Sequence, residues 1–123
     1  MTAAFDLDGT ISAYPQICGF LAHGIRRNGG KVVVLTGAVR GVGPGHDRAF
    51  RMNQLHEVNW NVGVDFDELV IAVGDDVSDV AREKAKWMKE NSAEIFIDDT
   101  ALFLMEAKKT NPGMLVLGVV PPQ

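Results

Sequence analysis

Two aspartates, one residue apart, follow the first apolar run of the sequence in the stretch FDLDGT. Asp6 could act as a carboxylate nucleophile and form an aspartyl-phosphate, and Asp8 could protonate a leaving oxygen and then activate water. Gly9 would let the backbone turn sharply past the pair. Aspartates also cap helices and build turns, but one residue would serve that purpose. The spacing therefore favours a chemical role for both carboxylates.

A second acidic pair, Asp98 and Asp99, ends another apolar run, and Thr36 ends a third. Ligands of open α/β sheets bind at the carboxyl ends of the strands, so these side chains should meet at one edge of a sheet. Carboxylates that gather in one partly buried site repel one another unless a cation compensates their charge. Magnesium accepts such oxygen ligands together with water and phosphate oxygens. The pattern therefore predicts a Mg²⁺ site.

Short apolar runs alternate with segments of helical spacing along the whole chain. Five runs predict strands, and most of them are uniformly apolar, as is typical of parallel strands covered on both faces: residues 3–7, 31–36, 68–73, 93–97 and 114–120. Between them, helices are expected over residues 15–27, 46–58, 78–91 and 100–109. The alternation predicts a Rossmann-like α/β fold, an open, mainly parallel five-stranded sheet with helices on both faces. A length of 123 residues predicts one domain, 1–123.

The composition narrows the classes of protein to consider. Apolar residues make up 46% and charged residues 23% of the chain, as in globular proteins. No apolar run is long enough to span a membrane, and no secretory signal is evident, so no membrane partner is expected. Cys18 is the only cysteine, which favours a reducing cytoplasm. The net charge of −4 does not suit a dedicated nucleic-acid binder, so nucleic acid is expected only as a substrate.

Four features, taken in chain order, resemble the motifs of the haloacid dehalogenase-like (HAD) superfamily. FDLDGT resembles the first motif, VVVLTG the second and IFIDDT the fourth, and Lys84 stands where the third motif has its lysine. The resemblance covers essentially the whole chain. It implies a magnesium-dependent phosphatase, a phosphohydrolase that acts on a phosphate monoester through an aspartyl-phosphate intermediate. An acid at Asp8 favours phosphoryl transfer over dehalogenation, because dehalogenating relatives lack it.

The resemblance implies a role for each motif residue. Asp6 would attack the substrate phosphorus, and Asp8 would act as general acid and base. Thr36 would hydrogen-bond the transferring phosphoryl group, and Lys84 would neutralise charge on the nucleophile and the phosphoryl oxygens. The implied ligands of Mg²⁺ are Asp6, Asp8 (through its backbone carbonyl), Asp98 and Asp99.

Two assignments remain open in the sequence. Lys86 lies on the same expected helix as Lys84 but on a different face, and Lys84 better matches the motif spacing. The stretch GDDVSD also resembles a fourth motif, although its place in the chain, before any candidate lysine, favours IDDT. Asp75 and Asp76 are then expected at the rim of the site, with metal contact or helix capping as the alternatives.

The segments where HAD relatives carry cap domains are short here, so the resemblance implies a capless member with an open site. Gly37 and Arg40 are the predicted substrate contacts, and His46 and Arg48 lie on the same loop. Together with Arg51 these basic residues form a local cluster, for which a solvated loop and helix face is the simpler interpretation and a contact with the substrate phosphate the alternative. The expected partner is a phosphorylated substrate, small or macromolecular, such as a polynucleotide end or a phosphoprotein.

Three further interpretations follow from the sequence. A non-catalytic HAD-like module that binds a phosphorylated partner is the main alternative, although the presence of every motif residue favours an enzyme. VVVLTGAVRGVG also resembles the glycine-rich turn of short-chain dehydrogenases, but it follows the second strand, and Tyr14 has no lysine four residues on. A homodimer could form through the last strand, at a sheet edge, although Pro121 and Pro122 would limit pairing beyond it.

Overall fold

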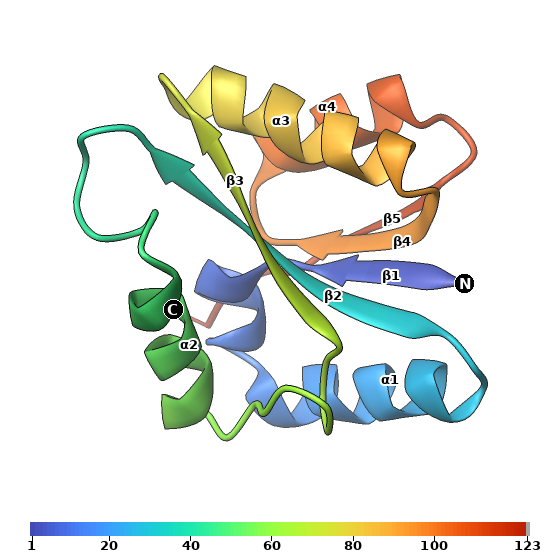
Figure 1. The fold of residues 1–123 in the computed structure, drawn as a ribbon. Helices are drawn as coiled ribbons and strands as arrows, with labels where there is room; N and C mark the ends of the chain where they lie inside the picture. Colours follow the sequence, from blue (N-terminus) through green and yellow to red (C-terminus); the bar gives the residue numbers. More distant parts are fainter. Residues whose placement is uncertain (123) are drawn as a thin grey trace.

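The computed structural model describes residues 1–122 and contains one sheet in which every strand runs parallel to its neighbours (Figure 1). The order across the sheet is β3-β2-β1-β4-β5, which confirms the predicted Rossmann-like α/β fold. β1 lies at the centre with β2 and β4 on either side, so the residues that follow these three strands are brought together. The strands are β1 (Thr2–Phe5), β2 (Lys31–Val39), β3 (Glu68–Gly74), β4 (Ala93–Asp98) and β5 (Leu115–Gly118).

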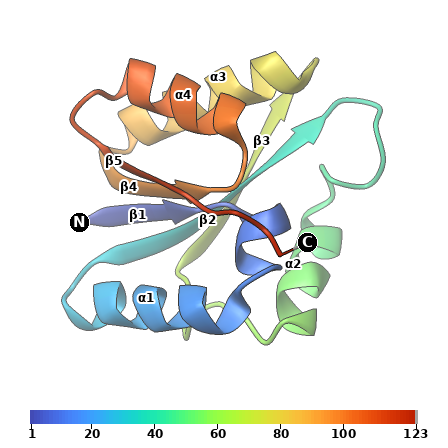
Figure 2. The same ribbon diagram turned by 180° about the vertical axis from the view of Figure 1, so that it is seen from behind.

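Four helices cover the two faces of the sheet: α1 (Pro15–Arg27), α2 (Arg48–Glu57), α3 (Val77–Glu90) and α4 (Ala101–Thr110). α1 and α2 lie on one face, and α3 and α4 lie on the other (Figures 1 and 2). Each face has its own apolar core: Trp60 packs between Phe5 and Phe66 on the first, and Met88 and Phe96 are buried on the second. Burial from both sides explains the uniformly apolar strands.

The strand ends differ from the predicted ones where the site begins. β1 ends at Phe5, because residues Leu7–Ile11 leave the sheet as a short π-helical turn, η1, in which Leu7 and Ile11 are still buried. β2 continues three residues beyond Thr36, because it pairs with β3 as far as Val39. α1 ends at Arg27, as predicted, before the Asn-Gly signal, and α4 ends at Thr110, one residue later than predicted, before the Asn-Pro signal.

Both junctions at which a cap domain could be inserted are short. Three residues separate η1 from α1, and two residues separate β3 from α3. Within residues 1–122 neither junction holds an inserted domain. The carboxyl edge of the sheet is bordered instead by the loop of residues 40–47 and by α2.

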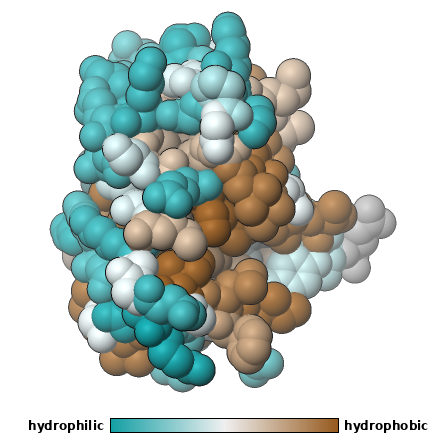
Figure 3. Space-filling view, turned by 90° about the vertical axis from the view of Figure 1, so that its right-hand side faces the viewer, coloured by the Kyte–Doolittle hydropathy of each residue, from teal (hydrophilic) through white to brown (hydrophobic). Residues whose placement is uncertain are grey.

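β5 forms one edge of the sheet, as predicted for the last strand, and the chain beyond it runs back toward η1 (Figure 2). The Tyr14 hydroxyl donates a hydrogen bond of 2.6 Å to the carbonyl of Val120, which connects the chain beyond β5 to the residue before α1. On the side of the molecule where β1 begins, an apolar patch lies beside extensive hydrophilic surface (Figure 3). The dimer through β5 stays a prediction. None of the helices in residues 1–122 is long and apolar enough to cross a membrane.

Candidate active site

Asp6 is the first residue beyond β1 and lies at the carboxyl edge of the sheet. Its backbone N–H donates to the carbonyl of Ile97 on β4, at 2.9 Å, so the residue is tied to the neighbouring strand. Only 5% of Asp6 is exposed. One carboxylate oxygen accepts a hydrogen bond from Lys84 Nζ at 2.8 Å, and the other accepts one from the Thr10 hydroxyl at 3.4 Å. Both oxygens are therefore held in place by protein donors.

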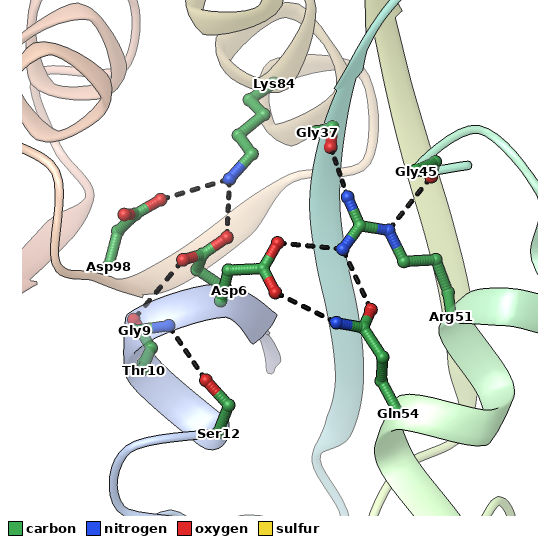
Figure 4. Close-up of polar contacts among 11 residues, drawn as sticks. Asp6, Gly9, Thr10, Ser12, Gly37, Gly45, Arg51, Gln54, Lys84 and Asp98 are labelled. Carbon is green, nitrogen blue, oxygen red and sulfur yellow. Dashed lines mark hydrogen bonds and ion pairs between the residues drawn. The ribbon is translucent and has the colours of Figure 1, made fainter. Parts of the chain in front are cut away.

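Lys84 places its ammonium group between two aspartates, Asp6 and Asp98, and is 1% exposed (Figure 4). The second contact, to Asp98 Oδ2, measures 3.1 Å, and the ammonium also lies 4.4 Å from the ring centroid of Phe103. Lys84 belongs to the buried face of α3, whereas Lys86 is exposed and lies 3.9 Å from Glu90. The structure therefore brings Lys84, and not Lys86, to the acidic residues.

The carboxylates outnumber the cation that lies among them. Burial raises the pKa of Asp6 to about 7; Lys84 opposes the rise, and the negative charges of Asp98 and Asp99 add to it. Burial likewise raises the pKa of Asp98, again against the influence of Lys84. When Asp6, Asp98 and Asp99 are all ionised, one lysine leaves the cluster with a net negative charge, which a bound cation would compensate.

Oxygens of Asp6, Asp98 and Asp99 all lie within 4.8 Å of one another, and within residues 1–122 this is where such a group occurs. Asp98 is committed to protein partners, because its Oδ1 accepts from the Thr100 N–H at 2.9 Å. Asp6 and Asp99 line the adjoining cavity instead. A side chain at Gly9 would place its Cβ 2.1 Å from Asp99 Oδ2, so glycine makes room for this carboxylate. An all-oxygen donor set with excess negative charge fits Mg²⁺.

Asp8 turns its carboxylate away from this cluster, toward α2. Its Oδ2 accepts from Arg51 Nη1 at 2.8 Å, and its Oδ1 accepts from the Gln54 side-chain amide at 3.2 Å. The sequence suggested a solvated helix face for Arg51, with a substrate-phosphate contact as the alternative, and it suggested no role for Gln54. The solvated interpretation is wrong for Arg51, which is buried and bound to Asp8. One signal was available: Arg51 precedes the buried Leu55 by four residues, so it is a charged residue on the apolar face of its helix.

An open cavity of about 340 Å³ adjoins these residues. Thr36 and Gly37 of β2 contribute to its wall, as predicted, although Thr36 is almost fully buried. A Cβ at Gly37 would lie 2.4 Å from Val80 Cγ1, so this glycine lets α3 approach the strand. The lining residues are Asp6, Asp8, Gly9, Thr36, Gly37, Ala38, Val39, Val77, Val80, Asp99, Thr100 and Phe103.

Arg40 does not reach the cavity. Its guanidinium forms an exposed ion pair with Asp75, at 2.6 Å, outside the lining residues. Arg48 donates to the carbonyl of Leu69 on β3, and His46 is exposed. Of the predicted substrate contacts, the structure places Gly37 at the site and leaves Arg40 at its periphery.

The second acidic stretch, GDDVSD, lies apart from the cluster because β2 separates β3 from β1. Asp76 caps α3, accepting a hydrogen bond of 2.7 Å from the Asp79 N–H. Neither Asp75 nor Asp76 belongs to the group of carboxylates around Asp6. The capping alternative is thus confirmed for Asp76, and β4, beside β1, supplies the acidic pair.

The dehydrogenase-like interpretation does not fit the local structure. Gly37 lies within β2, and a loop of eight residues follows before α2 begins. The N-terminus of α2 is capped by the carboxylate of Asp47, which accepts from the Ala49 N–H at 2.9 Å. A dinucleotide pyrophosphate would need those free N–H groups, which an acidic cap occupies.

No protein-family model matches this sequence, and no curated protein matches it either. Several solved structures resemble the fold, and two of them are described here. One is a chain of the Pnkp1/Rnl/Hen1 RNA repair complex, with a TM-score of 0.64 and 15% identity over 99% of this chain, which spans 43% of that chain. The other is a universal stress protein in complex with cAMP, with a TM-score of 0.57 and 15% identity, covering 99% of this chain and 98% of that one. These similarities establish the fold alone.

Replacing Lys84 with methionine should destabilise the protein strongly, because Asp6 and Asp98 would lose their shared cation while remaining buried. Loss of one partner from a buried ion pair costs about 3–5 kcal/mol. Urea titration measures the free energy of unfolding. Lys86→Met, on the exposed face of the same helix, is the matched control and should change that free energy by less than about 0.5 kcal/mol. Equal losses in the two variants would contradict the assignment of Lys84.

Gly9→Ala should also destabilise the protein more than Gly29→Ala. Both glycines have positive φ, +78° and +84°, so alanine strains the backbone at each. Only Gly9 faces Asp99, whereas nothing lies within 4 Å of a Cβ at Gly29. The steric overlap should add about 1–3 kcal/mol, measured as a difference between unfolding free energies. Similar values for both would mean that Asp99 does not need the space beside Gly9.

Proposed function

We propose that this protein is a HAD-type phosphatase, a magnesium-dependent phosphohydrolase that acts on phosphate monoesters through an aspartyl-phosphate intermediate. The observation that carries the proposal is the placement of Lys84 Nζ between Asp6 and Asp98, beside an open cavity that Asp6 itself lines. A buried carboxylate that is oriented by a cation and faces open space is suited to nucleophilic attack. The order of the four motif features along the chain supports the same class.

Asp6 is the proposed nucleophile. The Lys84 ammonium and the Thr10 hydroxyl fix the direction of its carboxylate, so little reorganisation is needed before attack. As the Asp6 oxygen bonds to phosphorus, the bond from phosphorus to the leaving oxygen breaks. Lys84 stabilises the charge that spreads over the phosphoryl oxygens, and the Thr36 hydroxyl, at the cavity wall, hydrogen-bonds one of them.

Asp8 is the proposed acid and base. It lines the same cavity as Asp6, and its side chain is 58% exposed, so substrate and water can both reach it. A proton passes from Asp8 to the leaving oxygen in the first step. In the second step Asp8 takes a proton from water, which attacks phosphorus and releases Asp6 and inorganic phosphate.

Mg²⁺ would be held by Asp6, Asp99 and the backbone carbonyl of Asp8, with Asp98 supporting the site through Lys84. When bound, the ion would compensate the negative charge of the carboxylates and the phosphate. Cys18 is buried, and burial raises the pKa of its thiol to about 11. An inert thiol of this kind fits the reducing cytoplasm in which we propose that the enzyme acts.

The cavity is open to solvent, so both small and macromolecular substrates could bring a phosphate group to it. Val77, Val80 and Phe103 form an apolar part of the cavity wall. A substrate panel should contain small phosphate esters, a phosphopeptide and an RNA with a terminal phosphate. The RNA is included because one of the solved structures that resemble this fold is a chain of an RNA repair complex.

Asp6→Asn should abolish hydrolysis of an aryl phosphate in the presence of Mg²⁺, because an amide is a poor nucleophile. We expect a loss of at least about 10³-fold in kcat, and wild-type activity should also disappear with a chelator. Glu94→Gln, an exposed acid on β4, serves as the control with unchanged activity. Activity that survives in Asp6→Asn would refute the nucleophile. A wild type without turnover on the whole panel would favour the non-catalytic binding module.

A further inference from the structure

We infer that Arg51 is a positioning residue, whose guanidinium, together with the amide of Gln54, fixes the direction of the Asp8 carboxylate in the site. The inference rests on the proposed phosphatase function and deepens it. It assigns a task to the first turns of α2, an element that carries none of the four motifs. The contacts around Arg51 support the inference in three ways.

Arg51 is buried and held in place by hydrogen bonds to the protein. It is 5% exposed, and its guanidinium donates to four acceptors: Asp8 Oδ2 at 2.8 Å, Gln54 Oε1 at 2.9 Å, the Gly37 carbonyl at 2.7 Å and the Gly45 carbonyl at 2.9 Å (Figure 4). A guanidinium has five N–H donors in a rigid, planar arrangement. Because protein acceptors occupy most of these N–H donors, Arg51 is poorly suited to bind a phosphate and well suited to orient Asp8.

Asp8 depends on this support for its orientation. Its backbone has φ −70° and ψ 123°, outside the helical range, and the next residue, Gly9, has φ +78°, so no regular element fixes the direction of the side chain. An exposed aspartate is free to sample several rotamers. Here Arg51 holds one carboxylate oxygen and Gln54 holds the other, and two-point binding selects one rotamer.

Arg51 also ties the loop beside the cavity to Asp8. The carbonyls that it binds belong to Gly37 and Gly45, on either side of a segment in which Gly41 and Gly43 have positive φ. A loop with two such glycines has little local stiffness. One buried side chain therefore connects the proposed acid to β2, through Gly37, and to the loop, through Gly45. A lysine keeps the charge, but its single nitrogen cannot reach four separated acceptors.

The test compares two phosphate monoesters that differ in their need for a proton. An alkyl phosphate has a poor leaving group that requires an acid, whereas dinitrophenyl phosphate releases a stable phenolate without one. The value of kcat/KM covers the steps up to departure of the leaving group. Arg51→Lys and Gln54→Leu should lower kcat/KM for the alkyl ester by about 10²-fold and change it for the dinitrophenyl ester by less than about threefold.

Arg27→Lys, at an exposed position on α1, is the control and should change neither value. Equal losses on the two esters would show a merely structural role and overturn the inference, as would unchanged values on both. Gln54 is only half buried, so Gln54→Leu keeps the test decisive should Arg51→Lys fail to fold. A wild type that hydrolyses neither ester would overturn the phosphatase proposal itself, which is a distinct result.

Discussion

The buried ammonium of Lys84 is the charge on which the arrangement of the site depends. It lies 2.8 Å from Asp6 and 3.1 Å from Asp98, two carboxylates that have lost almost all contact with water. Without a cation between them, this pair would be too costly to bury. The sheet order sets β1 beside β4, so Asp6 and Asp98 lie at the ends of neighbouring strands. α3 packs on β2 and β3, and its Lys84 side chain reaches both carboxylates from there.

The site also requires that side chains approach the backbone closely at two glycines. Gly9 leaves the space that the Asp99 carboxylate fills, and Gly37 lets Val80 of α3 pack against β2. A larger residue at either position would overlap a neighbouring side chain, so packing requires glycine at both. α2 completes the arrangement from the opposite face of the sheet, where Arg51 connects Asp8 to β2 and to the loop that follows it. The site is consequently built from both layers of helices, while Asp8 remains open to the cavity.

The sequence predicted the fold well, because most strands are nearly uniform apolar runs and clear stop signals follow α1 and α4. It also predicted the convergence of Asp6, Thr36, Lys84 and Asp99, since parallel strands end at a common edge. It could not predict the end of β1 at Phe5, because Leu7 stays buried in η1 and so reads as strand. The contact between Asp8 and Arg51 spans 43 residues and depends on how α2 docks, which local patterns do not encode. The prediction for Arg40 was wrong because this residue, although close to Thr36 in sequence, forms an ion pair with Asp75 outside the cavity.

The central claim is that Asp6 becomes phosphorylated during turnover. The most direct measurement is to stop the reaction with acid within the first turnovers, reduce the protein with borohydride and locate the modified residue by peptide mass spectrometry. An aspartyl-phosphate is reduced to homoserine, whereas a free carboxylate is not. The account predicts homoserine at position 6 and nowhere else, dependent on substrate and Mg²⁺. Homoserine at position 8 or 98, or an active enzyme that never yields it, would contradict the account.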